Sequence, residues 1–261
     1  MPSNPLSALT RRLSKRHKTV ADSISPEEAA ARGRLSDKLE YLSAMKIFQD
    51  LGQEELQAIE RATTMMNCPA GRVFYIPGET GEALFLLKKG RVQLYCLSPD
   101  GRKLTVKILE PMTFFGEMAI LGQGMYNTFA EALDDCLICV MSRQDVIRLL
   151  LGKPQVAARI CEELARRAME AEQRLEELAF KNVEARLAGL LVRLAGDGDE
   201  VMGYSHQELA ELLGIYRETV THVLSQLKAR GWIDIQRKRI RLLDRARWIE
   251  LSNRRGNDRS R

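Results

Sequence analysis

The spacing of apolar residues changes several times along this 261-residue chain, and each change predicts a different kind of structure. Residues 1–34 are rich in Ser, Arg, Lys and Ala and have no apolar period that could stabilise a fold, so we expect a mobile basic extension. Apolar residues recur at helical spacing across residues 38–63, with a break at Asp50-Leu51-Gly52, which predicts two short helices. The chain therefore begins with a polar tail followed by a small helical segment.

Between Met65 and Val140 the pattern becomes a series of short β-prone runs. Pairs such as Pro77-Gly78 and Lys89-Gly90 separate these runs and are typical of turns. The stretch FLLKKGRVQLYCLSPDGRKLTVKIL predicts successive strands, with Asp100-Gly101 at a tight hairpin turn. Strands of this length and spacing predict a small β-barrel or roll.

A long helical pattern begins after Pro154 and continues unbroken to Phe180 or beyond. Its apolar and small residues alternate steps of three and four, as a heptad seam does, while charged residues occupy the other faces. One helix packing on its own domain would show a similar pattern, but the alternating Ala and Leu layers favour a two-helix dimer seam. The seam residues are Cys161, Leu164, Ala168, Ala171, Leu175 and Leu178. Cys161 would face its counterpart there, either simply packing or forming an inter-subunit disulfide on oxidation.

The segment after the turn-rich linker Gly196–Glu200 predicts two helices joined by a tight turn. Ser205 and Glu208 form a capping box before a helix from His206 to Leu213, and Gly214 suits the left-handed turn that follows. A second helix from about Arg217 to Ala229 places four apolar residues on one face. This order is that of a helix-turn-helix, whose second helix enters the major groove of DNA.

The outward face of this second helix carries polar residues that can read base edges. Arg217 can contact guanine through two hydrogen bonds, and Glu218 can accept one from cytosine. Thr221 and His222 lie on the same face. A surface ion pair on an ordinary helical hairpin would look similar, but a basic β-hairpin follows, with a turn at Gln236-Arg237. Its residues Lys238, Arg239 and Arg241 suit contact with DNA phosphate, so the segment predicts a winged helix-turn-helix.

Composition agrees with two globular domains, since 45% of residues are hydrophobic and 29% are charged. Apolar runs fall short of the roughly 18 or more residues that span a bilayer, and the N-terminus has no apolar secretory segment. We therefore expect a cytoplasmic protein without a membrane partner. The net charge is only +5, but basic residues gather towards both ends. That asymmetry fits a polyanionic partner such as double-stranded DNA, although solvated charged tails would look the same.

Cysteine and histidine positions argue against a metal or haem centre. The five cysteines are an odd number and thinly spread, which suits free thiols. Cys136 and Cys139 form a C-x-x-C, but in a strand their side chains would point to opposite faces, so we expect both to pack in the core. The three histidines lie outside the central region. Neither a catalytic triad nor a phosphate loop is present, so we expect no enzyme activity, no metal and no cofactor.

These residues together resemble the cyclic-AMP receptor protein / fumarate-nitrate regulator (Crp/Fnr) family of bacterial transcription factors. The resemblance covers roughly Tyr41 to Leu243 and rests on the turn glycines, FGEMAIL, ELAFKNVEARLAGLL and HQELAELLGIYRETVTHVL. It implies an α+β fold: an antiparallel β-roll, a long dimerisation helix and a winged helix-turn-helix. It also implies a homodimer on a pseudo-palindromic DNA site, with RNA polymerase as a further partner.

The expected domains follow from the resemblance and from the pattern of residues. They are a basic extension (1–34), the β-roll with flanking helices (35–153), the dimerisation helix (154–182), the winged helix-turn-helix (183–251) and a basic tail (252–261).

The resemblance also implies particular contacts to DNA. Arg217 and Glu218 match the base-reading Arg-Glu pair of the family, which implies a half-site of the TGTGA type. His206, Gln207 and Thr219 match positions at the DNA backbone. There are two departures. His222 stands where cyclic-AMP receptor proteins have a second base-reading arginine, and Tyr216 replaces the usual serine before the helix.

The ligand cassette of the roll departs further from the family. Gly116 and Glu117 match the pair that holds the ribose of cyclic AMP. However, Asn127 and Thr128 replace the Arg-Ser pair that clamps the cyclic phosphate. A partly buried phosphate without a cationic partner is costly. We therefore expect regulation without cyclic AMP, by an unidentified effector or by none.

The long helix carries further departures from the ligand-binding pattern. Ala171 and Glu172 stand where the family has a Thr-Ser pair that contacts adenine. Arg167 and Glu172 match positions of the nitrogen-regulator branch, but that branch also needs an arginine where Thr128 stands. The oxygen-sensing branch uses an N-terminal cysteine cluster, and no cysteine precedes Cys68.

Other functions remain open from the sequence alone. An effector-dependent regulator would bind a cyclic nucleotide or another small molecule in the roll. A regulatory subunit built on such a roll, or an architectural protein that coats DNA, would be an alternative of a different class.

Ser14 follows Arg11-Arg12 at a spacing that basophilic serine kinases favour. A Ser/Thr kinase would then be a partner. If the basic extension assists DNA binding, phosphorylation of Ser14 would weaken that binding by adding negative charge.

Overall fold

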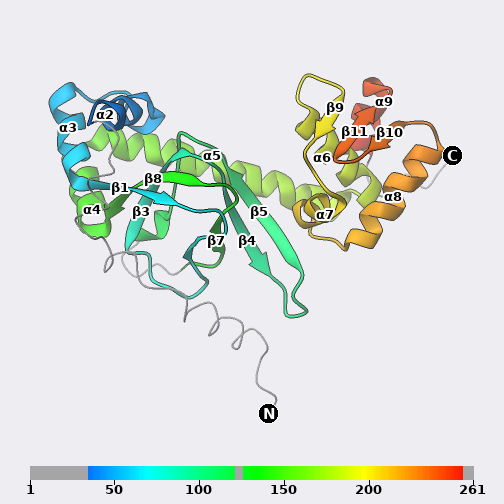
Figure 1. Cartoon of the computed structure of the whole chain (residues 1–261), viewed down its shortest axis with the longest axis horizontal. Helices are drawn as coiled ribbons and strands as arrows, with labels where there is room; N and C mark the ends of the chain where they lie inside the picture. Colours follow the sequence, from blue (N-terminus) through cyan, green and yellow to red (C-terminus); the bar gives the residue numbers. More distant parts are fainter. Residues whose placement is uncertain (1–34, 121–125, 255–261) are drawn as a thin grey trace, which may run out of the picture. The chain divides into compact units, whose positions relative to one another are not determined.

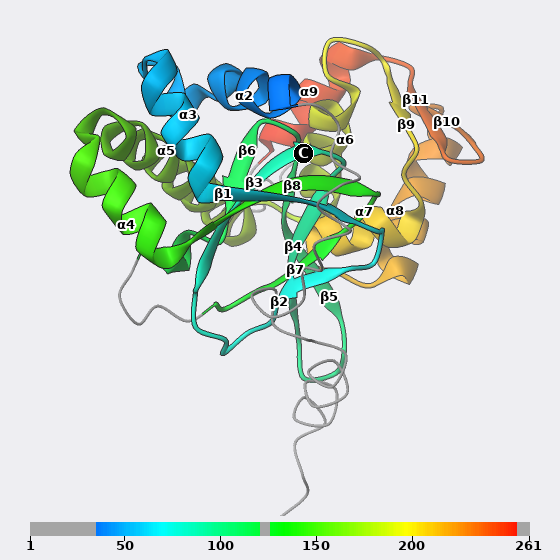
Figure 2. The same cartoon turned by 60° about the vertical axis from the view of Figure 1, so that its left-hand side comes forward.

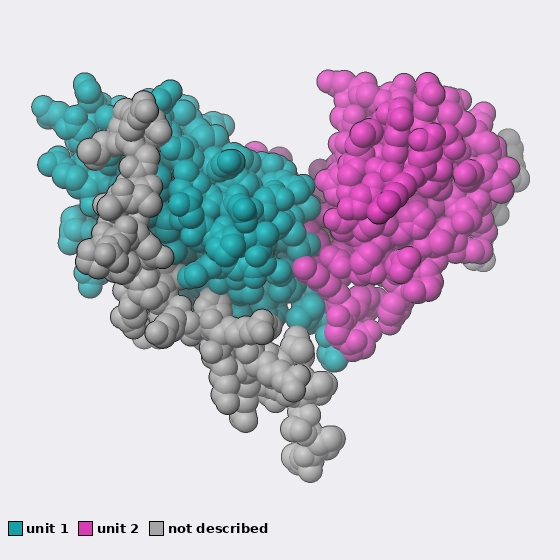
Figure 3. Space-filling model, in the orientation of Figure 1, with its two compact units in different colours: residues 1–99, 106–164 teal, residues 100–105, 165–261 magenta. Residues whose placement is uncertain are grey.

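The computed structural model describes residues 35–120 and 126–254, so Ser14 and most of both charged ends lie outside the described residues. The chain divides into two compact units, which Figure 3 distinguishes by colour. The first contains the described residues up to 99 together with residues 106–164. The second contains residues 100–105 and residues from 165 onward.

The first unit is built on two four-stranded sheets flanked by helices (Figure 1). One sheet has the order β1-β8-β3-β6 and the other β2-β7-β4-β5, and the pairs β1·β8, β3·β8, β3·β6, β2·β7 and β4·β7 are antiparallel. The helical elements are α2 (Leu35–Ala44), η2 (Lys46–Phe48), α3 (Gln53–Ala62), η3 (Glu117–Ala119) and α4 (Arg143–Gly152). The strands are β1 (Thr63–Cys68), β2 (Val73–Tyr75), β3 (Ala83–Lys89), β4 (Val92–Leu97), β5 (Lys103–Leu109), β6 (Thr113–Phe115), β7 (Phe129–Ala132) and β8 (Cys136–Ser142).

The sheet containing β3 and β8 is buried on both faces. On β3, Phe85 and Leu87 enter the core between the two sheets, whereas Leu84 and Leu86 enter the core under the helices. Figure 2 shows α3, α4 and α5 together on one side of this sheet. Cys136 and Cys139 follow the same alternation on β8 and are buried in different cores, which confirms that they point to opposite faces. Among the described residues, no group of three or more His, Cys, Asp or Glu side chains could hold a metal ion.

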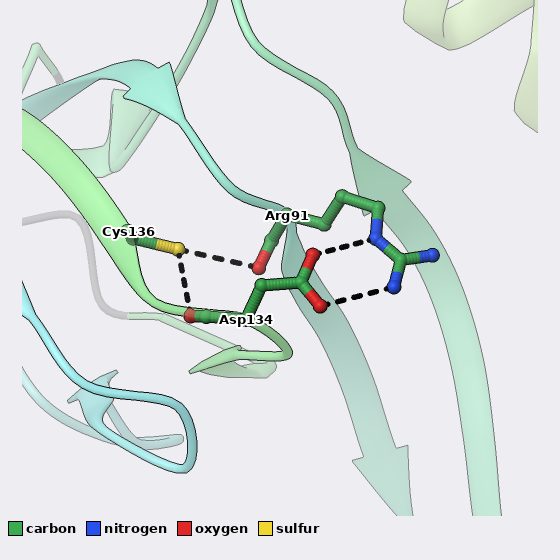
Figure 4. A network of polar contacts seen from close by, with 3 residues as sticks. All are labelled: Arg91, Asp134 and Cys136. Carbon is green, nitrogen blue, oxygen red and sulfur yellow. Dashed lines mark hydrogen bonds and ion pairs between the residues drawn. The ribbon is translucent and has the colours of Figure 1, made fainter.

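A polar clasp holds the place where the chain crosses between the sheets (Figure 4). Arg91 Nε and Nη2 donate to Asp134 Oδ2 and Oδ1, at 2.7 and 3.1 Å. Cys136 Sγ donates to the carbonyls of Arg91 and Asp134, at 3.4 and 3.3 Å. Gly90 precedes this clasp with φ +82°, and a Cβ there would lie 2.7 Å from Cys136 Sγ. Only glycine suits this position, because both the conformation and the space exclude a side chain.

Helix α5 (Pro154–Phe180) carries the chain from the first unit into the second. Val156 and Ile160 are buried in the core of the first unit. The helix ends before Asn182, whose Oδ1 accepts from the Ala185 N–H at 2.9 Å and caps the next helix, α6 (Val183–Ala195). The prediction of an unbroken helix to Phe180 is confirmed. No helix in the described ranges combines the length and the apolar character that a bilayer-spanning segment needs.

The second unit has one core shared by four helices and a small sheet. Its elements after α6 are β9 (Glu200–Met202), α7 (His206–Leu213), α8 (Arg217–Ala229), β10 (Ile233–Gln236), β11 (Arg239–Leu242) and α9 (Arg245–Asn253). The sheet is antiparallel with the order β10-β11-β9. Trp248 of α9 is fully buried in this core, and its Nε1 donates to the Trp232 carbonyl at 3.3 Å.

Helices α7 and α8 have the predicted bounds, but three elements were not predicted from the sequence. One is α6, a helix separate from α5 that begins after its cap Asn182. Strand β9 includes Glu200, which the sequence pattern placed in a linker, and α9 follows the wing. The hairpin turn lies at Arg237-Lys238, one residue later than predicted, because Gln236 pairs with Arg239 in the ladder.

We predict that Trp248→Ala lowers the free energy of unfolding of the second unit by about 3–5 kcal/mol, because it empties a large part of a shared core. Both tryptophans of the chain, Trp232 and Trp248, belong to this unit. The variant's urea transition can therefore be followed through Trp232 fluorescence. Ile249→Ala, on the same helix but 44% exposed, is the control and should change stability by less than about 0.5 kcal/mol. Equal effects of the two substitutions would contradict the assigned role of α9.

Candidate functional site: DNA interface and ligand cassette

The first helix of the pair, α7, begins at a complete capping box. Ser205 Oγ accepts from the Glu208 N–H at 3.2 Å, and Glu208 Oε2 accepts from the Ser205 N–H at 2.7 Å. The helix ends at Gly214, which has the left-handed conformation with φ +67° and ψ +34°. Both ends are therefore as the sequence predicts, and they fix the turn that leads into α8.

The second helix, α8, is buried on one face and open on the other. Val220, Val223, Leu224 and Leu227 are buried in the shared core. Arg217, Glu218 and His222 are exposed, and Thr219 and Thr221 are half-buried. Tyr216 occupies the N-cap position without a side-chain capping bond. The first turn of α8 therefore presents an arginine and a glutamate side by side, free of the core.

A side-chain contact links the two helices at this surface. His206 Nδ1, in the first turn of α7, lies 3.0 Å from Thr221 Oγ1 on α8. On the open face, His222 Nε2 lies 3.1 Å from Gln226 Nε2. Gln207 Nε2 donates to Glu211 Oε1 at 2.9 Å. The structure thus brings His206 and Thr221 together, a pairing that the sequence pattern did not predict.

The wing adds basic residues next to these helices. Lys238 is exposed and occupies the left-handed region, with φ +53°. Arg239 is held by Glu200 of β9: its Nε and Nη2 donate to Glu200 Oε2 and Oε1, at 3.0 and 2.5 Å. The hydrogen bonds from Arg239 lower the pKa of Glu200, and the same bonds raise the pKa of Arg239. Of the wing residues predicted to contact DNA, Arg239 is therefore already engaged with a carboxylate.

The ligand cassette lies in the first unit and begins at a tight turn. Gly116 has φ +83°, and a Cβ there would lie 2.6 Å from the Ala83 carbonyl oxygen, so only glycine suits this position. Glu117 opens the short helix η3. Asn127 is exposed and Thr128 is half-buried just before β7, while residues 121–125 lie outside the described residues. The two positions at which an Arg-Ser pair was expected by resemblance thus carry uncharged side chains.

Aromatic rings fill the core of the roll beside this cassette. Tyr75 and Tyr126 are buried and stack with ring centroids 3.6 Å apart and planes 6° from parallel. Phe85 and Phe115 stack nearby at 4.8 Å. The Tyr126 hydroxyl donates to the Ala83 carbonyl at 3.4 Å, and burial, with the carboxylate of Glu117 nearby, raises its pKa.

Most of the α5 positions that the sequence assigns to ligand contact or to the dimer seam are exposed. Arg167 is half-buried, and Glu172 is exposed. Of the seam residues, Leu164 packs against the core of the first unit. The others are exposed, namely Cys161, Ala168, Ala171, Leu175 and Leu178.

The fold and this surface define a winged helix-turn-helix protein that carries a roll of the cyclic-nucleotide-binding type. The model of the cyclic nucleotide-binding domain matches residues 65–152, and that of the Crp-like helix-turn-helix domain matches residues 185–250. The chain is 33% identical over 186 residues to the cyclic AMP receptor protein of Thermus thermophilus, covering 71% of this chain and 86% of that protein. It therefore belongs to the Crp/Fnr family of DNA-binding transcriptional regulators, and not to a family of enzymes.

Other relatives and solved structures agree with this assignment. A CRP-like cAMP-activated global transcriptional regulator of Mycobacterium tuberculosis is 28% identical over 216 residues, covering 80% of this chain and 96% of that protein. A crystal structure of a CRP/FNR family regulator from Thermus thermophilus has a TM-score of 0.62 and 29% identity, covering 74% of this chain and all of that one. A crp/fnr family structure from Eubacterium rectale, 22% identical with a TM-score of 0.68, covers 82% of this chain and 99% of that one, and shares the fold.

Proposed function

We propose that this chain is a homodimeric regulator that reads a TGTGA-like pseudo-palindrome through Arg217 and Glu218 and does so without cyclic AMP. The observation that carries the proposal is the exposed Arg-Glu pair in the first turn of α8, whose opposite face is buried. An arginine can contact guanine O6 and N7 together, and a glutamate can accept from cytosine N4. The pair therefore supplies two direct readouts of G·C pairs in the major groove.

A homodimer is supported by the exposed apolar face of α5. Leu175 and Leu178 are 65% and 54% exposed and lie on one face of the helix with the exposed Ala168 and Ala171. Large apolar side chains exposed in a row mark an interaction surface. A second copy of α5 running parallel would cover them in heptad fashion. The two recognition helices of such a dimer would read half-sites about one helical turn of DNA apart.

Independence from cyclic AMP is supported by the chemistry of the cassette. Two relatives carry names that describe them as a cyclic AMP receptor and a cAMP-activated regulator. In this chain, Asn127 and Thr128 offer no positive charge to a cyclic phosphate. The stacked rings of Tyr75 and Tyr126 pack in the core of the roll and contribute to its stability. The cassette therefore offers a cyclic phosphate no cationic partner at Asn127 and Thr128.

We predict that Arg217→Ala weakens binding to a TGTGA-type palindrome by about 1–3 kcal/mol per half-site and relaxes the preference at the guanine it reads. Lys228→Ala is the matched control, since it removes one exposed positive charge from the other end of the same helix. It should leave the base preference unchanged. Fluorescence anisotropy with single-base variants of the duplex measures both effects. An unchanged base preference in Arg217→Ala would overturn the assigned readout.

We expect the affinity for the same palindrome to change by less than about threefold when cyclic AMP is added, since allosteric effectors usually act more strongly. The double variant Asn127→Arg/Thr128→Ser restores the Arg-Ser pair and should bind cyclic AMP in isothermal titration, whereas the wild-type protein should give no binding heat. If DNA binding by the wild-type protein strictly required cyclic AMP, this account of the cassette would be wrong.

We predict that the double variant Leu175→Asp/Leu178→Asp sediments as a monomer, because it places carboxylates in the proposed seam. Its affinity for the palindrome should fall by on the order of 100-fold, since the two half-sites are no longer bound together. Leu151→Asp is the control, because Leu151 is 81% exposed on α4, outside the seam. A double variant that remains dimeric would show that α5 is not the dimer interface.

A further inference from the structure

The small sheet of the wing has one buried face and one open face. Val201, Ile233, Ile240 and Leu242 point into the shared core and are at most 3% exposed. The open face carries Glu200 from β9, Asp234 and Gln236 from β10, and Arg239 and Arg241 from β11. The charged side chains on this open face therefore contribute little to core packing, which leaves the question of what they could bind.

A hollow of about 260 Å³ opens on this face, lined by Asp234, Gln236, Arg239 and Arg241. Two guanidinium groups and the carboxylate of Asp234 border it, and the exposed basic residues Arg237 and Lys238 form the turn between β10 and β11. Paired arginines in a hollow of this size suit an anion with several oxygen atoms, such as a phosphate group. The same unit contains the recognition helix α8, which joins β10 through Arg230, Gly231 and Trp232.

Glu200 occupies the Arg239 side of this arrangement. Its two carboxylate oxygens accept from Nε and Nη2 of Arg239 at 3.0 and 2.5 Å, the fork geometry with which arginine also binds phosphate. Glu200 also stands opposite Arg241 in the ladder. The carboxylate therefore holds the place that an oxyanion of DNA could take.

The ion pair is exchangeable and is not needed to hold β9. The side chains of Glu200 and Arg239 remain 32% and 44% exposed, and ion pairs this exposed are weak and screened by salt. Strand β9 pairs with β11 along its length, and two further backbone bonds flank it: Gly203 N–H to Lys238 O at 2.8 Å and Leu242 N–H to Asp199 O at 2.7 Å. The backbone ladder thus anchors the strand without the side-chain pair.

We propose that the open face of the wing is a second contact for DNA phosphate, and that Glu200 restrains it by holding Arg239 as an internal substitute for the phosphate. The proposal rests on the DNA-binding function and concerns sequence-independent affinity only. While Glu200 holds Arg239, the wing contributes to DNA affinity chiefly through its turn residues Arg237 and Lys238. When the bound DNA extends beyond the site read by α8, a phosphate of this flanking DNA competes with Glu200 for the guanidinium group of Arg239.

The test is the binding of full-length Glu200→Gln to duplex DNA without a TGTGA-type half-site, followed by fluorescence anisotropy over a range of salt concentrations. We expect affinity to rise on the order of 3- to 10-fold at moderate salt, and the slope of log K against log salt to steepen by about 0.9, the value for one added phosphate contact. Asp234→Asn is the matched control: it removes the same charge from the same face but leaves the Glu200–Arg239 pair intact.

A double-variant cycle assigns the effect to Arg239. The gain from Glu200→Gln should disappear in an Arg239→Gln background, because the released guanidinium is then absent. A loss of affinity in Glu200→Gln, a gain equal to that of Asp234→Asn, or a gain that persists without Arg239 would each overturn the proposal. Because the readout uses DNA without the half-site, an error in the proposed half-site leaves this result unaffected and appears only as a missing preference for the palindrome.

Discussion

The burial of one face of α8 in a shared core is the constraint on which the DNA interface depends. Val220, Leu224 and Leu227 lie against residues of α6, α7, the wing and α9, and Trp248 closes this core. The helical period then turns Glu218 and His222 away from the core, whereas Arg217 is exposed because it is the first residue of the helix. The same core holds the wing, so the recognition helix and the basic hairpin form one body.

The roll keeps the packing of its domain class, but its ligand cassette carries uncharged side chains at two key positions. The β1-β8-β3-β6 sheet is buried on both faces, and the clasp of Arg91 with Asp134 closes the crossover between sheets. Gly116 keeps the tight turn of the cassette, whereas Asn127 and Thr128 lack the charge that a cyclic phosphate needs. The fold of the cyclic nucleotide-binding domain is thus retained, while the positions at which the family resemblance implies ligand contacts carry Asn127, Thr128, Ala171 and Glu172.

Long periodic segments were predictable from the sequence, because α5, α7 and α8 each follow a clear apolar period or have strong caps. Strand β9 was missed because three residues are too few for an alternation to appear. Helix α9 was missed because it is short and its apolar residues do not gather on one face: Trp248 and Leu251 are buried, but Ile249 is exposed. The contacts of His206 with Thr221 and of Glu200 with Arg239 depend on tertiary pairing, which no local pattern reveals.

The most direct test of the central claim is selection of bound duplexes from a pool with randomised half-sites, using the full-length protein without added nucleotide. The account predicts enrichment of TGTGA-type pseudo-palindromes whose half-sites are about one helical turn apart. It also predicts that the preference for one G·C pair of each half-site disappears in the Glu218→Ala protein. Enrichment of no sequence above the random pool, or enrichment only after cyclic AMP is added, would contradict it.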